Sequence, residues 1–257
     1  MTAADGSAGG AARARAWRDA VHASVCDSRT AWEHGAVVRA SRYPSYHDFN
    51  LVQVEDDPGI DVGALIDFAE TTLAGLDHGR IDFDLIEVAE PLRADFEGRG
   101  WVAGRLLWMR HEQTPPRYSD QPQLEVVEVD YGAVDHLRLA WAVDEHPDQD
   151  PTDYLEQARE VALLRGVQVL AAKTGEACVA YAQLEHDGGS AEITQVYVGA
   201  EHRGAGLGTA LTPAAISAAG EVADLWILAD DEGRAKDLYR RLGFRPVWTT
   251  MEFTLWP

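Results

Sequence analysis

Hydrophobic and polar positions along the chain alternate in patterns that predict both helices and strands. Apolar residues recur at helical spacing over residues 62–76, and they alternate with acidic residues over 81–86, as in a strand. The same reading predicts further strands at 35–40, 49–55, 105–110, 124–129, 167–172, 177–184, 225–229 and 248–255, and further helices at 17–26, 90–98, 134–141, 151–164 and 233–242. This mixture predicts an α/β protein built from mixed layers of sheet and helix.

Residues 191–220 read as a strand, a glycine loop and a helix. Residues 193–198 are rich in β-branched and aromatic side chains, and apolar residues at helical spacing follow the loop. The loop itself reads Arg203-Gly204-Ala205-Gly206-Leu207-Gly208. Its glycines leave no Cβ between the backbone N–H groups and a ligand, and the start of the following helix carries a partial positive charge. Such a loop favours a phosphate or diphosphate, to which Arg203 adds a cation.

The spacing of this loop differs from two common nucleotide-binding loops. No Gly-Lys-Ser or Gly-Lys-Thr ends it, and its Gly-x-Gly-x-Gly order is not that of a dinucleotide fingerprint. Together with the later run Ala235-Lys-Asp-Leu-Tyr239 and the pair Gly243-Phe244, the loop resembles the acetyl-CoA-binding core of the GNAT superfamily of N-acetyltransferases. The resemblance covers the chain from about residue 124 onward.

The resemblance implies a mixed, mostly antiparallel sheet with flanking helices and acetyl-CoA as co-substrate. It also implies that strand 193–198 splays from its neighbour and offers backbone groups to the pantetheine arm. The residues expected to bind the cofactor are Val196, Tyr197, Val198, Arg203, Gly204, Ala205, Gly206, Leu207, Gly208, Thr209 and Glu232. Many family members carry Asn at the last of these positions, where this chain carries Glu232 beside two further acidic residues.

Amide formation from a thioester requires a neutral amine, stabilisation of an oxyanion and a proton for the departing thiolate. Tyr239 lies where the family places its general acid, so we expect its phenol to protonate or hydrogen-bond the leaving sulfur. Glu192, at the start of the splayed strand, is the first choice for the general base. Glu185, His186 and Gln195 remain alternatives for contact with the substrate. Acidic residues from Asp144 to Asp153 are candidates to line the entrance for a cationic amine.

An internal repeat emerges when the chain is shifted by 143 residues, a shift that places Phe83 on Trp226 and Phe96 on Tyr239. The same shift matches Gly100 with Gly243 and Trp101 with Phe244, at the end of each copy. In the N-terminal copy Ile60, Asp61 and Leu65 stand where the loop has Arg203, Gly204 and Gly208, and an acidic loop repels a diphosphate. We therefore expect a tandem GNAT-like protein with a degenerate first half.

These patterns predict four segments. Residues 1–15 are small and look like a disordered tail, and 16–112 form the degenerate GNAT-like domain. The proline-containing stretch 113–123 reads as a linker, and 124–257 form the domain that binds acetyl-CoA.

Composition narrows the function further. The formal net charge of −21 in 257 residues argues against nucleic acid as a partner. The two cysteines have no metal-binding spacing, which predicts no metal and suits the reducing cytoplasm. No apolar stretch approaches the roughly 18 to 20 residues of a membrane span.

The favoured interpretation is a cytoplasmic, acetyl-CoA-dependent N-acetyltransferase that acts on a primary amine of a small molecule by direct attack in a ternary complex. Acetylation of a protein N-terminus or lysine remains open, as does an acyl-CoA-binding regulator without turnover. The sequence leaves the acceptor, the acyl length and the choice between monomer and homodimer open.

Overall fold

The computed structural model describes residues 3–112, 125–145 and 147–256. They form two compact units. The first unit contains residues 3–108, 229–233 and 246–256, and the second contains 109–112, 125–145, 147–228 and 234–245. The chain thus divides differently from the expected boundaries, because residues 229–233 and 246–256 group with the first unit. The predicted linker, 113–123, lies outside the described residues. No helix of the described chain is long and apolar enough to cross a membrane.

The first segment of the chain is helical. Helix α1 runs over Ala3–Val25, so the prediction of a disordered tail is wrong for residues 3–15. Alanine-rich sequence favours this helix, and packing fixes it. A Cβ at Gly10 would lie 2.9 Å from Val247, and Trp17 is 4 % exposed. The absence of a side chain at Gly10 is therefore what lets the helix approach the last strand so closely.

The remaining elements of the first unit are strands and the helices that connect some of them in sequence. They are β1 (Ser28–Trp32), β2 (Gly35–Arg39), β3 (Leu51–Val54), α2 (Val62–Thr72), β4 (Gly79–Phe83), α3 (Ile86–Ala89), α4 (Arg93–Glu97), β5 (Val102–His111) and β11 (Phe244–Leu255). Their strand order is β1-β2-β3-β4-β11-β5. Strands β3 and β4 are parallel, and β11 runs antiparallel to β4 with Met251 opposite Phe83.

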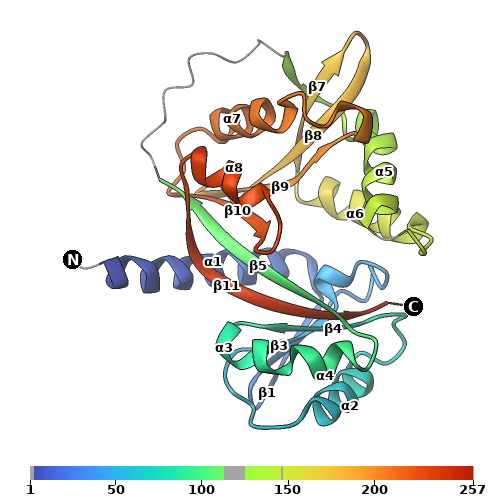
Figure 1. Cartoon of the computed structure of the whole chain (residues 1–257). Coiled ribbons are helices and arrows are strands. Elements are labelled where there is room, and N and C mark those ends of the chain that lie inside the picture. The colour runs from blue at the N-terminus through green and yellow to red at the C-terminus, as the bar shows by residue number, and fades with distance from the viewer. Residues whose placement is uncertain (1–2, 113–124, 146, 257) are drawn as a thin grey trace. The chain divides into compact units, whose positions relative to one another are not determined.

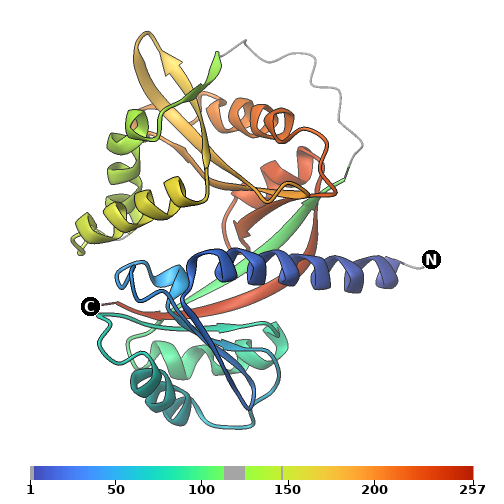
Figure 2. The same ribbon diagram turned by 180° about the vertical axis from the view of Figure 1, so that it is seen from behind.

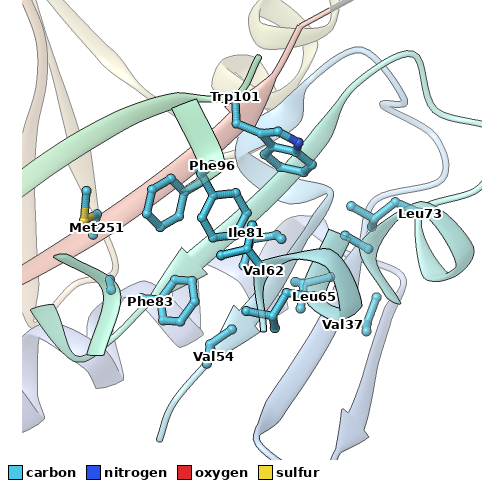
Figure 3. Packing of buried hydrophobic residues seen from close by; sticks show 14 residues of the cluster. Val37, Val54, Val62, Leu65, Leu73, Ile81, Phe83, Phe96, Trp101 and Met251 are labelled. Carbon is cyan, nitrogen blue, oxygen red and sulfur yellow. The ribbon is translucent and has the colours of Figure 1, made fainter. Parts of the chain in front are cut away.

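The core of the first unit lies under α2 and α4. Figure 3 shows side chains from α2, β4 and β11 converging there. Phe96 of α4 stacks on Phe253 of β11 with ring centroids 4.0 Å apart, and Phe83 meets the same ring edge-on at 5.8 Å. Strand β11 therefore supplies a central part of this core, although it lies at the far end of the sequence.

A buried carboxylate ties α1 to the strands of the first unit. Asp84 is 1 % exposed and pairs with both Arg15 and Arg18, and its backbone oxygen accepts a hydrogen bond of 2.8 Å from the indole of Trp248. Both guanidinium groups also lie over the Trp248 ring, at 5.1 and 5.0 Å from its centroid.

The second unit is a sheet with helices on both faces. Its elements are β6 (Val126–Val129), α5 (Asp135–Glu145), α6 (Thr152–Leu164), β7 (Gln168–Thr174), β8 (Ala177–His186), β9 (Ser190–Val198), α7 (Leu207–Ala219), β10 (Asp224–Asp230) and α8 (Ala235–Arg241). The strand order is β10-β9-β8-β7-β6, and within it β9 and β10 are parallel while β6 to β9 pair antiparallel. Helix α7 covers one face of β7 to β9, and α5 and α6 cover the other (Figures 1 and 2). The predicted class, a mixed α/β sheet with flanking helices, is confirmed.

The order of elements recurs between the two halves as the 143-residue shift predicts. Apart from the short helix α3 and the single 3-10 turns, the succession strand, helix, strand, helix, strand is β3-α2-β4-α4-β5 in one half and β9-α7-β10-α8-β11 in the other. Gly100 and Gly243, which the shift superimposes, both have positive φ, at 85° and 95°. One difference concerns the last strand of each half, because β11 and not β5 lies directly beside β4.

Candidate functional site

The parallel pairing of β9 with β10 ends partway along β9. The two strands pair from Ser190 to Ile193 and from Asp224 to Ile227, whereas β9 continues to Val198. On its other side, the register of β9 against β8 shifts between Tyr181 and Gln183. Gln195 lies in this bulge with φ 45°, and no other non-glycine residue of the described chain has positive φ. Such a conformation costs about 1–3 kcal/mol and persists only where the surroundings hold it.

Two side-chain hydrogen bonds stabilise this bulge. The side-chain oxygen of Gln195 accepts hydrogen bonds from the Tyr181 hydroxyl, at 3.3 Å, and from the Gln183 amide, at 3.1 Å. Val196 and Val198 follow the bulge and lie beyond the last pair between β9 and β10, although Tyr197 and Val198 are still in register with β8. Backbone groups without a strand partner are available to a ligand.

The glycine loop opens directly onto the start of α7. Gly204 and Gly206 both have φ 82°, and a Cβ at either position would meet nothing within 4 Å. Gly206 caps α7, and the first helical backbone bond runs from Ala210 to its oxygen at 3.1 Å. The N–H groups of Leu207, Gly208 and Thr209 therefore precede that first bond, at the positive end of the helix dipole.

Three elements meet near this helix start. A Cβ at Gly208 would lie 3.7 Å from Leu238 of α8 and 4.0 Å from Val198 of β9. The end of β9, the first turn of α7 and the middle of α8 are thus neighbours. Ala205 is exposed at the tip of the loop, whereas Leu207 is 5 % exposed and anchors it.

Arg203 is engaged by a carboxylate. Its guanidinium pairs with Asp144, near the end of α5, and its Nε donates to the backbone oxygen of Val198 at 3.1 Å. The Tyr197 hydroxyl donates to the same Asp144 carboxylate at 2.8 Å, and Arg203 lies 5.4 Å from the centre of the Tyr197 ring. The hydrogen bond from Tyr197, followed by that from Arg203, lowers the pKa of Asp144.

Tyr239 lies on α8 with 6 % of its surface exposed, at a ring-centroid distance of 6.2 Å from Phe244. Burial raises the pKa of its phenol to about 12. The group therefore stays protonated at neutral pH, and it is suited to donate a hydrogen bond.

Glu192 lies in the paired part of β9, one residue before the pairing with β10 ends. It is 8 % exposed and lies opposite Glu185 of β8 and Trp226 of β10. Glu185 is held by Arg165, whose Nε and Nη2 each lie 2.8 Å from its carboxylate. A buried carboxylate at the point where two strands separate remains a candidate base.

Glu232 belongs to the first unit and pairs there with Arg93 at 2.9 Å. Its neighbour Asp231 pairs with Arg105 at 2.7 Å. The negative charge that the sequence places before α8 is therefore largely compensated within the first unit. The assignment of Glu232 to cofactor binding stays a prediction.

The loop of the first unit that corresponds to the glycine loop is already capped. Asp61 precedes α2 and its carboxylate accepts the backbone N–H of Ala64 at 3.0 Å. Leu65, which stands where the other half has Gly208, is fully buried. A carboxylate therefore occupies the helix start at which the second unit has a bare glycine, as expected for a half without a diphosphate site.

Comparison with known proteins agrees with this geometry. Residues 133–244 match the model of the acetyltransferase (GNAT) family. The match covers residues 133–244 alone, and we refer to this stretch as the GNAT domain. No curated protein matches the sequence. The GNAT domain begins just before α5 and ends at the first residue of β11, so it contains the separated strands, the glycine loop and Tyr239.

Solved structures share the fold at low identity. A functionally unknown conserved protein from Staphylococcus epidermidis is 16 % identical with a TM-score of 0.69, over 89 % of this chain and 93 % of the other. A GCN5-related N-acetyltransferase from Sphaerobacter thermophilus is 16 % identical with a TM-score of 0.52, over 86 % and 77 %. A tandem GNAT protein from the clavulanic acid biosynthesis pathway is 17 % identical with a TM-score of 0.48, over 80 % and 75 %. The first of these extends the likeness in fold beyond the GNAT domain, to most of the chain.

Features of two residues of the GNAT domain were not predicted from the sequence. Asp144 was named only as a candidate to line the entrance for an amine, and neither its place in α5 nor its ion pair with Arg203 was predicted. Arg138 was not singled out, although it is 2 % exposed inside the same helix. A signal existed, because Arg138 lies four residues from both Val134 and Ala142, which are buried, and so interrupts the apolar stripe of the helix.

Proposed function

We propose that the second unit is an acetyl-CoA-dependent N-acetyltransferase that acetylates a primary amine of a small molecule. The observation that carries this proposal is the separation of β9 from β10 beside a glycine loop that opens α7. A thioester arm can lie along the backbone near Val196, on the side where β9 no longer pairs with β10, while a diphosphate meets the N–H groups of the first turn of α7. The whole of this arrangement lies within the GNAT domain.

The backbone N–H groups of the glycine loop are more readily available to a diphosphate than the guanidinium of Arg203 is. Nothing obstructs Gly204 or Gly206, whereas Arg203 must exchange Asp144 for a phosphate before it can bind one. We infer that the backbone N–H groups provide most of the diphosphate binding and that Arg203 adds to it after leaving Asp144. An exposed ion pair of this kind contributes little, so the exchange is accessible at room temperature.

The reaction proceeds by direct attack in a ternary complex. The amine nitrogen attacks the thioester carbonyl carbon, a C–N bond forms, and the C–S bond breaks to release the thiolate of CoA. A backbone N–H of β9 beyond Ile193 polarises the carbonyl oxygen, Glu192 accepts the proton of the amine, and Tyr239 donates a hydrogen bond to the leaving sulfur. We place the reaction in the cytoplasm, where the free thiols of Cys26 and Cys178 remain reduced.

Release of CoA thiol tests this function directly. Purified protein is incubated with acetyl-CoA and a panel of primary amines that contains amino acids, polyamines, aminosugars and a lysine-containing peptide. We expect release above background with at least one small amine. Binding of acetyl-CoA with background release for every amine would favour the regulator, and release with the peptide alone would favour a protein acetyltransferase.

A further inference from the structure

Several polar side chains lie among the apolar ones on the face of the second unit's sheet that meets α5 and α6. Residues opposite each other in paired strands share a face, so Gln183 of β8 shares one with Thr194 of β9. Glu192 lies two residues before Thr194 on the same strand and is paired with Trp226, so these residues point to that face as well. Tyr181 follows by the same alternation along β8.

Two polar atoms on this face have no partner. The Thr194 hydroxyl and the Trp226 indole nitrogen are buried without a hydrogen bond to any described residue. An unsatisfied buried polar group costs about 1–3 kcal/mol, so such atoms are rare in folded proteins. Both lie within two residues of the point at which β9 and β10 separate, which is the point where the proposed reaction takes place.

Arg138 of α5 lies at the same face, and two of its three guanidinium nitrogens have no hydrogen-bond partner among the described residues. Its Nη1 donates to the backbone oxygen of Leu155 at 3.3 Å, and its Cζ lies 4.7 Å from the centre of the Tyr131 ring. Its Nε and Nη2 have no hydrogen-bond partner in the described part of the chain. Burial raises the pKa of the Tyr181 phenol, and the positive charge of the guanidinium and a hydrogen bond from it to that phenol both oppose this increase.

Among the described residues, the other arginines whose side chains are similarly buried pair with carboxylates. Arg18 pairs with Asp84, Arg80 with three carboxylates and Arg165 with Glu185. Arg138 is more buried than these, at 2 % exposed, yet no carboxylate of the described chain forms an ion pair with it. A buried cation without a counter-charge is expensive, so its presence calls for an anion from outside the chain.

The free atoms indicate which anion fits. Nε and Nη2 lie on one edge of the guanidinium plane, and their N–H bonds point in the same direction. This edge matches the two oxygens of a carboxylate and binds them in a bidentate manner. We propose that Arg138 binds a carboxylate of the acceptor, so that the acceptor is an amino acid or a related amine that carries a carboxylate. This inference rests on the proposed acetyltransferase function and narrows its substrate class.

Pairs of ligands that differ in one charge test the inference. Each standard L-amino acid is compared with its carboxamide, which keeps the amine and the side chain but lacks the carboxylate. Binding is measured by thermal shift and calorimetry in the presence of saturating CoA, and acetylation is measured by thiol release from acetyl-CoA. For at least one pair we expect the acid to bind and react at least about tenfold better than the amide.

Variants of two arginines distinguish loss of the proposed carboxylate contact from the general effect of removing an arginine near Tyr131. Arg138→Gln should abolish the preference for the acid, and Arg138→Lys should reduce it, since an ammonium keeps the charge but loses the bidentate edge. Arg159→Gln is the matched control, because Arg159 lies 5.9 Å from the same Tyr131 ring but is exposed and pairs with Asp135 at 2.7 Å. Arg159→Gln should leave the preference for the acid over the carboxamide unchanged. If Arg138→Gln does not fold, the lysine variant and the ligand pairs still decide.

The outcomes distinguish the two proposals. Equal binding of acids and amides, retention of the preference in Arg138→Gln, or no binding of any amino acid would overturn the carboxylate site. Arg138-dependent binding of acids without acetylation would overturn the acetyltransferase and retain the site. Acetylation of amines without any preference for the carboxylate would retain the acetyltransferase function and overturn the carboxylate site.

Discussion

Replacing Tyr239 by Phe removes the proposed hydrogen bond to the leaving sulfur and little else. Burial raises the pKa of this phenol to about 12, whereas an ordinary thiol has a pKa of about 8.5. Full transfer of the proton to a thiolate would therefore be uphill by about 5 kcal/mol, so the phenol acts as a hydrogen-bond donor. A hydrogen bond to a charged group contributes about 1.5–3 kcal/mol, which predicts a fall in kcat of roughly 10- to 150-fold.

Steady-state kinetics and a pH profile check this prediction. KM for acetyl-CoA and thermal stability should change little, because Phe96, which the repeat places on the same position, is fully buried in the other half. The phenol titrates near its raised pKa, so wild-type kcat should show no loss through Tyr239 between about pH 7 and 10. A variant with wild-type kcat, or a wild-type decline near pH 10 that the variant lacks, would refute the reasoning.

Three further predictions address the two units. Phe253→Ala should lower the free energy of unfolding by about 3–5 kcal/mol in urea titrations, whereas exposed Val102→Ala should change it by less than about 0.5, and equal effects would contradict the role of β11. Asp144→Asn should strengthen acetyl-CoA binding up to about fivefold in calorimetry by releasing Arg203, and weaker binding would mean that Asp144 positions Arg203 for the phosphate. Burial raises the pKa of Glu252 from 4.5 to about 7, so the folded state binds the extra proton and wild-type stability should fall as pH rises from 4.5 to 7. Glu252→Gln should flatten this slope in melts at a series of pH values, and an unchanged slope would exclude Glu252 as its source.

The sequence predicted the local features of the GNAT domain well because they depend on short-range patterns. A β-rich strand, a glycine loop and an amphipathic helix are encoded within residues 191–220, and the structure contains β9, the loop and α7 in that order. The mixed α/β fold class is confirmed, and the resemblance to the GNAT family is confirmed for residues 133–244. The roles of Glu192 and Tyr239 stay predictions, since no ligand contact tests them.

What the sequence missed depends on long-range partners. Strand β1 was not predicted because its residues are mostly exposed and lack an apolar alternation. Helix α1 extends over residues that composition alone marks as disordered, because contacts such as that of Gly10 with Val247 stabilise it. The place of β11 beside β4, and the pairing of Arg203 with Asp144, join residues far apart in the chain, and no local pattern encodes such choices.

Calorimetric titration with acetyl-CoA is the most direct test of the central claim, that the glycine loop of the second unit binds this co-substrate. Wild type is compared with Gly206→Glu, which places a carboxylate at the start of α7, and with Gly175→Glu as a control. Both glycines have positive φ, at 82° and 60°, and at both a Cβ would meet nothing within 4 Å, so the backbone strain and the added charge are matched. We predict one site per chain in wild type and in Gly175→Glu, and none in Gly206→Glu. Undiminished binding by Gly206→Glu, or no binding by wild type, would contradict the account.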